Sequence, residues 1–200
     1  NKGLNRLGCM LPYMPFHFLL FQSMELPALV MTSGNISDEP IYIDDEIAYT
    51  KLSPLSDAIL SYNRAIENRC DDSVLSVVNE KPRIIRRSRG YVPNPIRVNV
   101  STEGILACGA ELKNTFALGK DQQCILSQHI GDLKNLETYE FFVESVDRFS
   151  KLFRFKPAVI ACDQHPDYLS SRYAHARKGV CHEVQHHHAH IGAVMAEVGL

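Results

Sequence analysis

The sequence contains no apolar run long enough to cross a bilayer, which takes roughly 18 consecutive apolar residues. Residues 16–21 form the most apolar early segment, but it is short, contains His17 and lacks the small-residue cleavage site of a signal peptide. We therefore expect a soluble protein, with no membrane among its partners.

The sequence also has no excess of either charge. Its 21 Lys and Arg against 23 Asp and Glu give a formal charge of −2, which argues against a protein that coats polyanions. No nucleic acid partner is expected.

Cysteine is sparse: six residues stand singly, without a CxxC pair. This spacing excludes a small disulfide-stapled scaffold. Four of them, Cys108, Cys124, Cys162 and Cys181, lie in or beside apolar runs, as reduced, buried cysteines do. The composition therefore predicts a cytoplasmic protein.

What is present fits a globular chain of one domain or two small ones, with 200 residues of which 45% are hydrophobic. The chain starts at Asn1 without an initiator Met and ends within a predicted helix, so we expect a fragment of something longer.

The first half reads as mixed α/β structure. The patterns predict strands at residues 28–32 and 58–62, a helix at 44–52, and a hairpin whose strands cover 73–78 and 83–86. Pro93 and Pro95 then forbid a helix and favour an extended connector. We place a domain boundary there, giving domains at 1–98 and 99–200.

The second half is more regular. Strands are predicted at 105–108, 115–119, 124–128, 158–162 and 180–184, with helices at 167–177 and 186–198. Between residues 136 and 153, apolar residues recur every three or four positions, which predicts a long amphipathic helix. Strands in a row followed by alternating helix and strand indicate an α/β fold, with a hairpin-led sheet continuing into parallel βαβ units.

Three segments could hold phosphate or a nucleotide. Ser33 and Asn35 follow the first predicted strand, although such a sequence is also an ordinary turn. Arg86 and Arg87 belong to a run of four arginines within seven residues, which suits phosphate contacts or a charged sheet edge. The loop GAELKNT carries Lys113 and Asn114 but lacks Walker spacing.

The strongest motif is QHHHAH at residues 185–190. His186 and His190 are four residues apart on a predicted helix, so both imidazoles can reach one metal ion. A polar helix start with satisfied histidines is the alternative. His187 and His188 point elsewhere, toward a substrate or a supporting role. The segment DQHPD at residues 163–167 is a possible source of a third ligand, or simply a helix cap.

Long motifs also resemble a known family. MTSGN at 31–35, NRCDDSV at 68–74 and IRRSRGY at 85–91 resemble the second half of a YrdC/TsaC-type adenylate-forming domain in its HypF version. GAELKNTF at 109–116, SQHIGD at 127–132, NLET at 135–138, HPDYLS at 165–170 and QHHHAHI at 185–191 resemble the opening of the TsaD-like domain that follows it. The TsaD-like domain is itself similar to the actin/Hsp70-type ATPase fold.

The resemblance implies carbamoyl transfer in [NiFe]-hydrogenase maturation. Carbamoyl phosphate and ATP, with Mg²⁺, would give a carbamoyl-adenylate, whose carbamoyl group passes to the C-terminal cysteine of the partner HypE. Ser33 and Asn35 would hold the nucleotide. Asp72 and Ser73 fall where the family often carries a Ser-Thr pair, and Arg86 lies near the phosphates. His186 and His190 match the divalent metal ligands, for Fe or Zn. The first half of the YrdC-like domain and the acidic metal ligands would lie outside this chain.

Two other functions stay open. The enzymes that make threonylcarbamoyladenosine in tRNA use the same two domain types, usually as separate proteins. A non-catalytic fragment that binds nucleotide or metal is the second.

Overall fold

The computed structural model describes residues 3, 5–37 and 39–200, which form two compact units. The first unit covers residues 1–32 and the second covers 33–200, and each is described by itself. No helix within the described ranges is both long and apolar enough to cross a bilayer.

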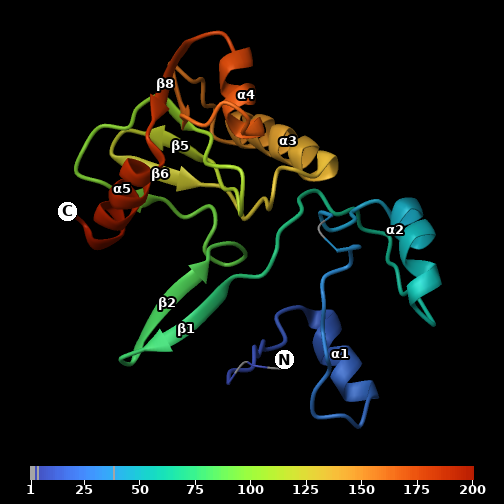
Figure 1. Ribbon diagram of the computed structural model, residues 1–200. Helices are drawn as coiled ribbons and strands as arrows, with labels where there is room; N and C mark the ends of the chain where they lie inside the picture. Colours follow the sequence, from blue (N-terminus) through green and yellow to red (C-terminus); the bar gives the residue numbers. More distant parts are fainter. Residues whose placement is uncertain (1–2, 4, 38) are drawn as a thin grey trace. The chain divides into compact units, whose positions relative to one another are not determined.

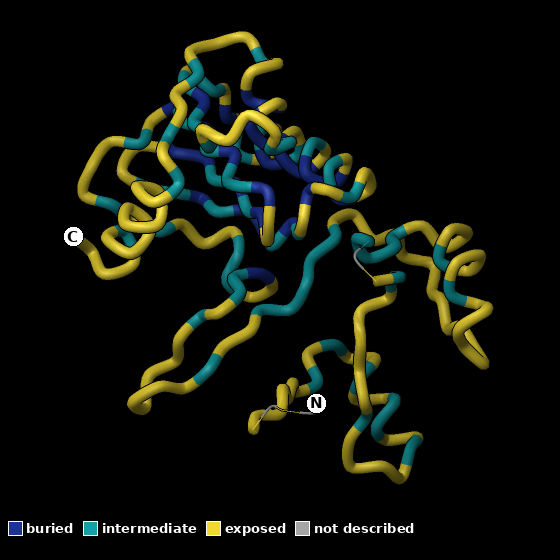
Figure 2. The backbone as a smooth tube through the Cα atoms, in the orientation of Figure 1, coloured by how far each residue is buried: buried dark blue, intermediate teal, exposed yellow. Residues whose placement is uncertain are grey.

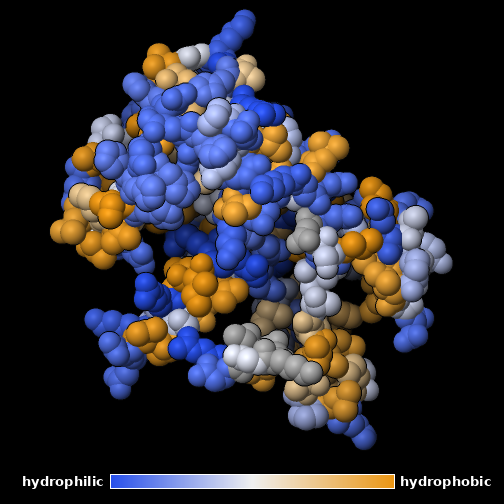
Figure 3. Space-filling model, viewed as in Figure 1, coloured by the Kyte–Doolittle hydropathy of each residue, from blue (hydrophilic) through white to orange (hydrophobic). Residues whose placement is uncertain are grey.

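The first unit contains one helix in its described residues, α1 (Pro15–Ser23), which begins with a proline where no intrahelical donor is required. None of its residues is buried, and the apolar side chains of Phe18 and Leu19 are exposed. Figure 3 shows hydrophobic surface, in orange, in the region of this helix. The strand predicted at residues 28–32 was wrong, because no described segment pairs with this apolar stretch.

The second unit opens with loops around a short helix, α2 (Asp45–Leu52), and a 3-10 turn, η1 (Ser53–Leu55). The side chain of Asp44 accepts a hydrogen bond from the Ile47 amide and caps α2, which confirms the predicted helix. The strand predicted at residues 58–62 was wrong. That segment is exposed throughout and pairs with no described strand.

The predicted hairpin is confirmed. Strands β1 (Val74–Val78) and β2 (Lys81–Arg86) pair antiparallel and form a separate two-stranded sheet (Figure 1). Asn79 and Glu80 turn the chain with φ angles of 50° and 62°. Positive φ at both central residues is the geometry that matches the twist of a two-residue hairpin.

A six-stranded sheet forms the centre of the second unit, in the order β3-β6-β5-β4-β7-β8. The pairs β3–β6, β6–β5 and β5–β4 are antiparallel, whereas β4–β7 and β7–β8 are parallel. The α/β prediction of a hairpin-led sheet that continues into parallel strands is therefore confirmed. The strands are β3 (Ile96–Arg97), β4 (Ile105–Ala107), β5 (Ala117–Lys120), β6 (Gln123–Leu126), β7 (Val159–Asp163) and β8 (Val180–Val184).

Three helices accompany this sheet: α3 (Leu136–Leu152), α4 (Leu169–Ala176) and α5 (His186–Val198). The Asn135 side chain caps α3 by accepting hydrogen bonds from two backbone amides. The predicted apolar stripe of α3 buries Phe142, Val146 and Phe149 in the core. Helix α4 connects β7 to β8 and packs on β7.

The core of the second unit lies between the six-stranded sheet and helices α3 and α4, where the buried backbone gathers in Figure 2. Before Gly104, Ser88 is the only described residue that is buried. Burial is thus concentrated in the part that positions the histidine helix.

Candidate functional site

The start of α5 brings two imidazoles together. The Gln185 side chain caps the helix by accepting hydrogen bonds from the amides of His187 and His188, at 2.7 and 3.1 Å. One turn apart, His186 and His190 turn their Nε2 atoms toward each other at 3.2 Å. Two imidazoles on one tetrahedral metal, with bonds of about 2.0–2.1 Å, place their nitrogens roughly 3.3 Å apart. The pair therefore fits a shared metal ion.

Asp163, at the end of β7, holds one of these rings. Its Oδ2 lies 2.6 Å from Nδ1 of His186, and its side chain is only 9% exposed. Burial acts to raise the pKa of the Asp163 carboxyl, but hydrogen bonds from His186 and the His165 amide outweigh burial, so the pKa lies below its ordinary value. A carboxylate on Nδ1 leaves Nε2 as the nitrogen for a metal.

The rest of the DQHPD segment is engaged locally. His165 stacks on Tyr168 with ring centroids 4.2 Å apart. Asp167 forms an exposed ion pair with Arg172 at 3.2 Å. His187, in α5, lies beside Gln185, with Nδ1 2.7 Å from the amide nitrogen of that side chain. Among these residues, Asp163 is the one that contacts the histidine pair.

A pocket of about 290 Å³ lies elsewhere in the second unit. Two parts of the chain form its wall, the loops at residues 33–71 and the segments around Lys113 and residues 129–141. The charged or polar side chains that line it include Ser33, Asn35, Arg69, Asp71, Lys113, His129 and Asp132. The first predicted nucleotide segment and Lys113 therefore share one cavity.

Asn35 is one of the residues that line this pocket. Its Nδ2 donates to the carbonyls of Ile36 and Glu39, at 3.0 and 2.8 Å. Its Oδ1 is buried and, among the residues that the structure describes, has no hydrogen-bond partner. An unpaired buried acceptor is costly, so a ligand that donates a hydrogen bond here would remove that cost. Ser33, beside it, is exposed.

Arg86 and Arg87 of the arginine run donate hydrogen bonds to nearby backbone carbonyls. Arg86 Nε donates to the Asp72 carbonyl at 3.0 Å. Arg87 donates to the carbonyls of Tyr91 and Asn94, at 3.2 and 2.9 Å. Neither arginine lines the pocket. These contacts stabilise the link between the hairpin and the following loop.

Asp72 and Ser73 stabilise the same link. The Asp72 carboxylate accepts from Arg89 Nε at 3.1 Å. The Ser73 hydroxyl donates to the Arg89 carbonyl and accepts from the Ser88 amide, both at 2.8 Å. Their neighbour Asp71 lines the pocket, whereas Asp72 and Ser73 do not. Their assignment to the nucleotide stays a prediction.

The loop between β4 and β5 is tightly folded. Gly109 has φ of +70°, and a Cβ there would lie 2.2 Å from the Thr115 carbonyl oxygen. The Asn114 side chain is buried and donates to the carbonyls of Cys108 and Ala110, at 3.0 and 2.6 Å. The buried Asn114 side chain therefore stabilises the conformation of this loop.

Lys113 is the member of this loop that reaches the pocket, and its amide donates to Asp132 Oδ1 at 2.6 Å. His129 lies close by. Burial lowers the pKa of His129, and the positive charges of Arg86 and Lys113 act in the same direction against the opposing charges of Asp71 and Asp132. The site prediction missed His129, whose only sequence signal was the SQHIGD motif.

One salt bridge and one hydrogen bond to a backbone carbonyl link the loop at residues 67–69 to helix α3 beside the pocket. Arg69 pairs with Glu144 of α3 at 3.1 Å, and its guanidinium lies 5.3 Å from the centre of the Phe141 ring. Arg148, also on α3, contacts the Glu67 carbonyl and the Glu144 carboxylate. The loops of the first half are thereby fixed against the second.

One more cluster combines metal-binding side chains. Cys162, His175 and Cys181 bring one possible ligand atom each to within 4.8 Å of the others. From the sequence, both cysteines are expected only as reduced, buried residues, so this cluster was not predicted. All six cysteines are free of disulfide bonds.

Two family profiles match this chain. The profile described as "HypF Kae1-like domain" covers residues 100–197, and the one described as "Telomere recombination", of the Sua5/YciO/YrdC group, covers residues 1–88. The boundary at residues 98 and 99 stays a prediction.

Named relatives match nearly the whole chain. "Carbamoyltransferase HypF" of Synechocystis sp. is 44% identical over 199 residues, which cover 99% of this chain and 26% of the relative. The Rhizobium leguminosarum protein of the same name is 39% identical over 201 residues, 98% of this chain and 26% of that one.

Solved structures agree. A crystal structure of full-length HypF in the phosphate- and nucleotide-bound form superposes with a TM-score of 0.90 and 48% identity, covering 96% of this chain and 30% of that one. The T. kodakarensis HypF structure superposes with a TM-score of 0.92 and 39% sequence identity, covering 98% of this chain and 26% of that one. This chain thus spans about a quarter of the length of its curated relatives. It belongs to the carbamoyltransferase HypF family.

Proposed function

We propose that the chain supplies the junction between the adenylate-forming and transfer domains of a HypF-type carbamoyltransferase. Carbamoyl phosphate, water and ATP, with Mg²⁺, would give a carbamoyl-adenylate, inorganic phosphate and pyrophosphate. The carbamoyl group would then pass to the sulfur of the C-terminal cysteine of HypE, with release of AMP. Such an enzyme would work in the cytoplasm, without membrane or nucleic acid.

The observation that carries this proposal is the shared pocket. Ser33, Asn35 and Arg69 come from the part matched by the YrdC-type profile, whereas Lys113, His129 and Asp132 come from the Kae1-like part. A cavity lined by both parts suits an intermediate that one domain makes and the other consumes. Arg69 and Lys113 can contact its phosphate, and the carboxylates of Glu39, Asp71 and Asp132 in the same lining can hold the accompanying Mg²⁺.

Within that pocket each residue has a distinct task. The free Oδ1 of Asn35 accepts a hydrogen bond from the nucleotide, with the exposed Ser33 hydroxyl beside it. Arg69 and Lys113 neutralise phosphate charge. Outside the pocket, hydrogen bonds of Arg86, Arg87, Asp72 and Ser73 stabilise the end of the hairpin, and those of Asn114 stabilise the loop that carries Lys113.

The histidine pair is the proposed metal site of the transfer domain. Nε2 of His186 and of His190 would bind a divalent Fe or Zn ion, and Asp163 would hold the His186 ring by its Nδ1. When bound, such an ion polarises a carbonyl or phosphoryl oxygen as a Lewis acid.

A chimera tests the substrate. This chain would replace the matching segment of the Synechocystis relative, and ATP–pyrophosphate exchange would be measured with carbamoyl phosphate or with threonine and bicarbonate. We expect exchange with carbamoyl phosphate alone. Exchange that needs threonine would favour the tRNA-modifying enzymes, and a folded chimera without exchange would favour a binding role. The unaltered relative is the control.

A further inference from the structure

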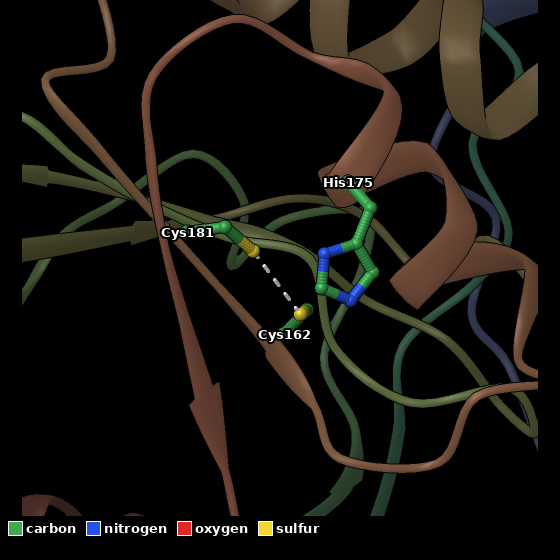
Figure 4. Close-up of side chains that lie close together, drawn as sticks. All are labelled: Cys162, His175 and Cys181. Carbon is green, nitrogen blue, oxygen red and sulfur yellow. Dashed lines mark hydrogen bonds between the residues drawn. The ribbon is translucent and has the colours of Figure 1, made fainter.

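Two strands of the six-stranded sheet and one helix packed on it bring two cysteines and a histidine together. Cys162 comes from β7, Cys181 from β8 and His175 from α4 (Figure 4). The two sulfur atoms lie 3.5 Å apart, and the three possible ligand atoms all lie within 4.8 Å of one another. Over the described ranges, no other group of three or more His, Cys, Asp or Glu meets so closely.

Strand register explains why the cysteines meet. In the parallel pair β7–β8, Ile160 lies opposite Cys181, and Cys162 lies opposite Glu183. Ile160 and Cys162 are two residues apart and so share a face of β7, which is the face that Cys181 occupies on β8. Helix α4 packs on β7 and adds His175.

We propose that Cys162, Cys181 and His175 bind a thiophilic divalent cation of the zinc class. Two thiolates and one imidazole are a preferred zinc donor set, with water as the fourth ligand. Zn–S bonds of about 2.3 Å in a tetrahedron set the sulfurs roughly 3.8 Å apart, a few tenths of an ångström from the separation seen here. On binding, each thiol releases its proton to water and its sulfur forms one bond to the metal.

Access and orientation both suit a metal. Cys162 is 4% exposed, but the His175 side chain is 48% exposed, so an ion can enter from the histidine side. Nε2 of His175 lies 3.3 Å from the Glu183 carboxylate, and a ring nitrogen faces the sulfurs in Figure 4. A carboxylate that holds the outer nitrogen fixes the ring for binding through Nδ1.

The proposed site would also stabilise the two strands, β7 and β8, that position the histidine pair at the start of α5. Cys162 directly precedes Asp163, which bonds His186, and β8 leads through Gln185 into α5. A cation here would tie β7, β8 and α4 together. This inference does not depend on the proposed carbamoyl transfer.

Cobalt titration tests the site, because a sulfur-to-cobalt charge-transfer band in the near ultraviolet requires a bound thiolate. The parent for this test is the purified chain carrying His186→Ala and His190→Ala, metal-free and kept reduced, so that the other proposed metal site is removed. We expect the band to grow to saturation and to disappear when Zn²⁺ is added.

Variants in the same background decide the ligands. Cys181→Ser should abolish the band and Cys124→Ser, the matched control, should retain it. His175→Ala should weaken cobalt binding, and Glu183→Gln should weaken it about tenfold. Because the side chains of His175 and Glu183 are about half exposed and lie outside the core, these two variants test the site without disturbing the core. No band in the parent, or an equal band after Cys181→Ser, would overturn the proposal.

Discussion

At the scale of single residues, the contact between Asp163 and His186 decides how the histidine helix can act. A helix alone places His186 and His190 on one side, but it leaves each ring free to rotate. The 2.6 Å bond to Asp163 fixes the His186 ring with Nε2 toward His190. The carboxylate thus prepares the nitrogen that a metal needs.

Asp163→Asn should therefore weaken metal binding about 10- to 100-fold, because an amide cannot hold the ring as a carboxylate does. Zinc affinity would be measured in a Cys181→Ser background, so that the thiol cluster does not contribute. Asp167→Asn, which alters an exposed ion pair only, should match its parent. Unchanged affinity in Asp163→Asn would refute the positioning role.

His129, in the pocket, makes the stability of the folded protein depend on pH. Its pKa in the folded protein lies below the unfolded value of about 6.5, so the unfolded chain takes up a proton more readily. The stability linked to neutral His129 is complete above about pH 6.5 and declines as pH falls toward the lower folded pKa. Urea unfolding between about pH 7.5 and about pH 5, on both sides of the ordinary His pKa, measures this decline.

We expect His129→Gln to flatten this decline, whereas His182→Gln, at an exposed position, should leave the profile as it is. The same slope in the parent and in His129→Gln would show that other groups set the pH response.

At the scale of elements, helix α3 holds the second unit together. Phe142 is fully buried, with its ring centroid 6.0 Å from that of Phe116 and 4.9 Å from that of Tyr173. Phe142→Ala should lower the free energy of unfolding by about 3–5 kcal/mol. Leu152→Ala, on the same helix but 66% exposed, should cost less than about 0.5 kcal/mol. Urea unfolding compares them, and similar losses would contradict the burial pattern.

Elements with their own local signals could be predicted from the sequence. The hairpin followed from two strand-like segments around turn residues, and α3 followed from its apolar period. Strands at 28–32 and 58–62 were wrongly predicted because a strand also needs a partner, which the pattern of one segment cannot reveal.

The residues of the candidate site also fall into two groups, those predictable from one local segment and those that depend on how the strands pair. The HxxxH spacing lies within one helix, so the approach of His186 and His190 could be predicted. Asp163, 23 residues earlier, and the Cys162–His175–Cys181 cluster depend on the register of β7 and β8. The arginines of the hairpin were plausible phosphate ligands by composition, but backbone carbonyls that sequence cannot position engage Arg86 and Arg87.

Taken as a whole, this chain spans about a quarter of the length of its relatives. Adenylation and transfer each need charged groups assembled around the substrate. We therefore predict that the 200-residue chain, incubated with ATP, Mg²⁺, carbamoyl phosphate and HypE, gives no carbamoyl adduct on the HypE C-terminal cysteine. Mass spectrometry of that peptide, against a control without the chain, would detect an adduct and so refute the prediction.

We propose that two sites, the pocket and the histidine pair, carry separate steps of one reaction. The chimera with the Synechocystis relative allows both steps to be measured on the same protein. Exchange of pyrophosphate with ATP reports the first step, and the mass of the HypE C-terminal peptide reports the second.

The decisive measurement compares two double variants of that chimera in both assays. Ser33→Ala with Asn35→Ala should lower the exchange rate about 10- to 100-fold, as loss of hydrogen bonds to a charged ligand does, and should leave the metal content intact. His186→Ala with His190→Ala should retain exchange and lose the HypE adduct. Exchange lost with the histidines, or retained without Ser33 and Asn35, would contradict the division of labour between the two sites.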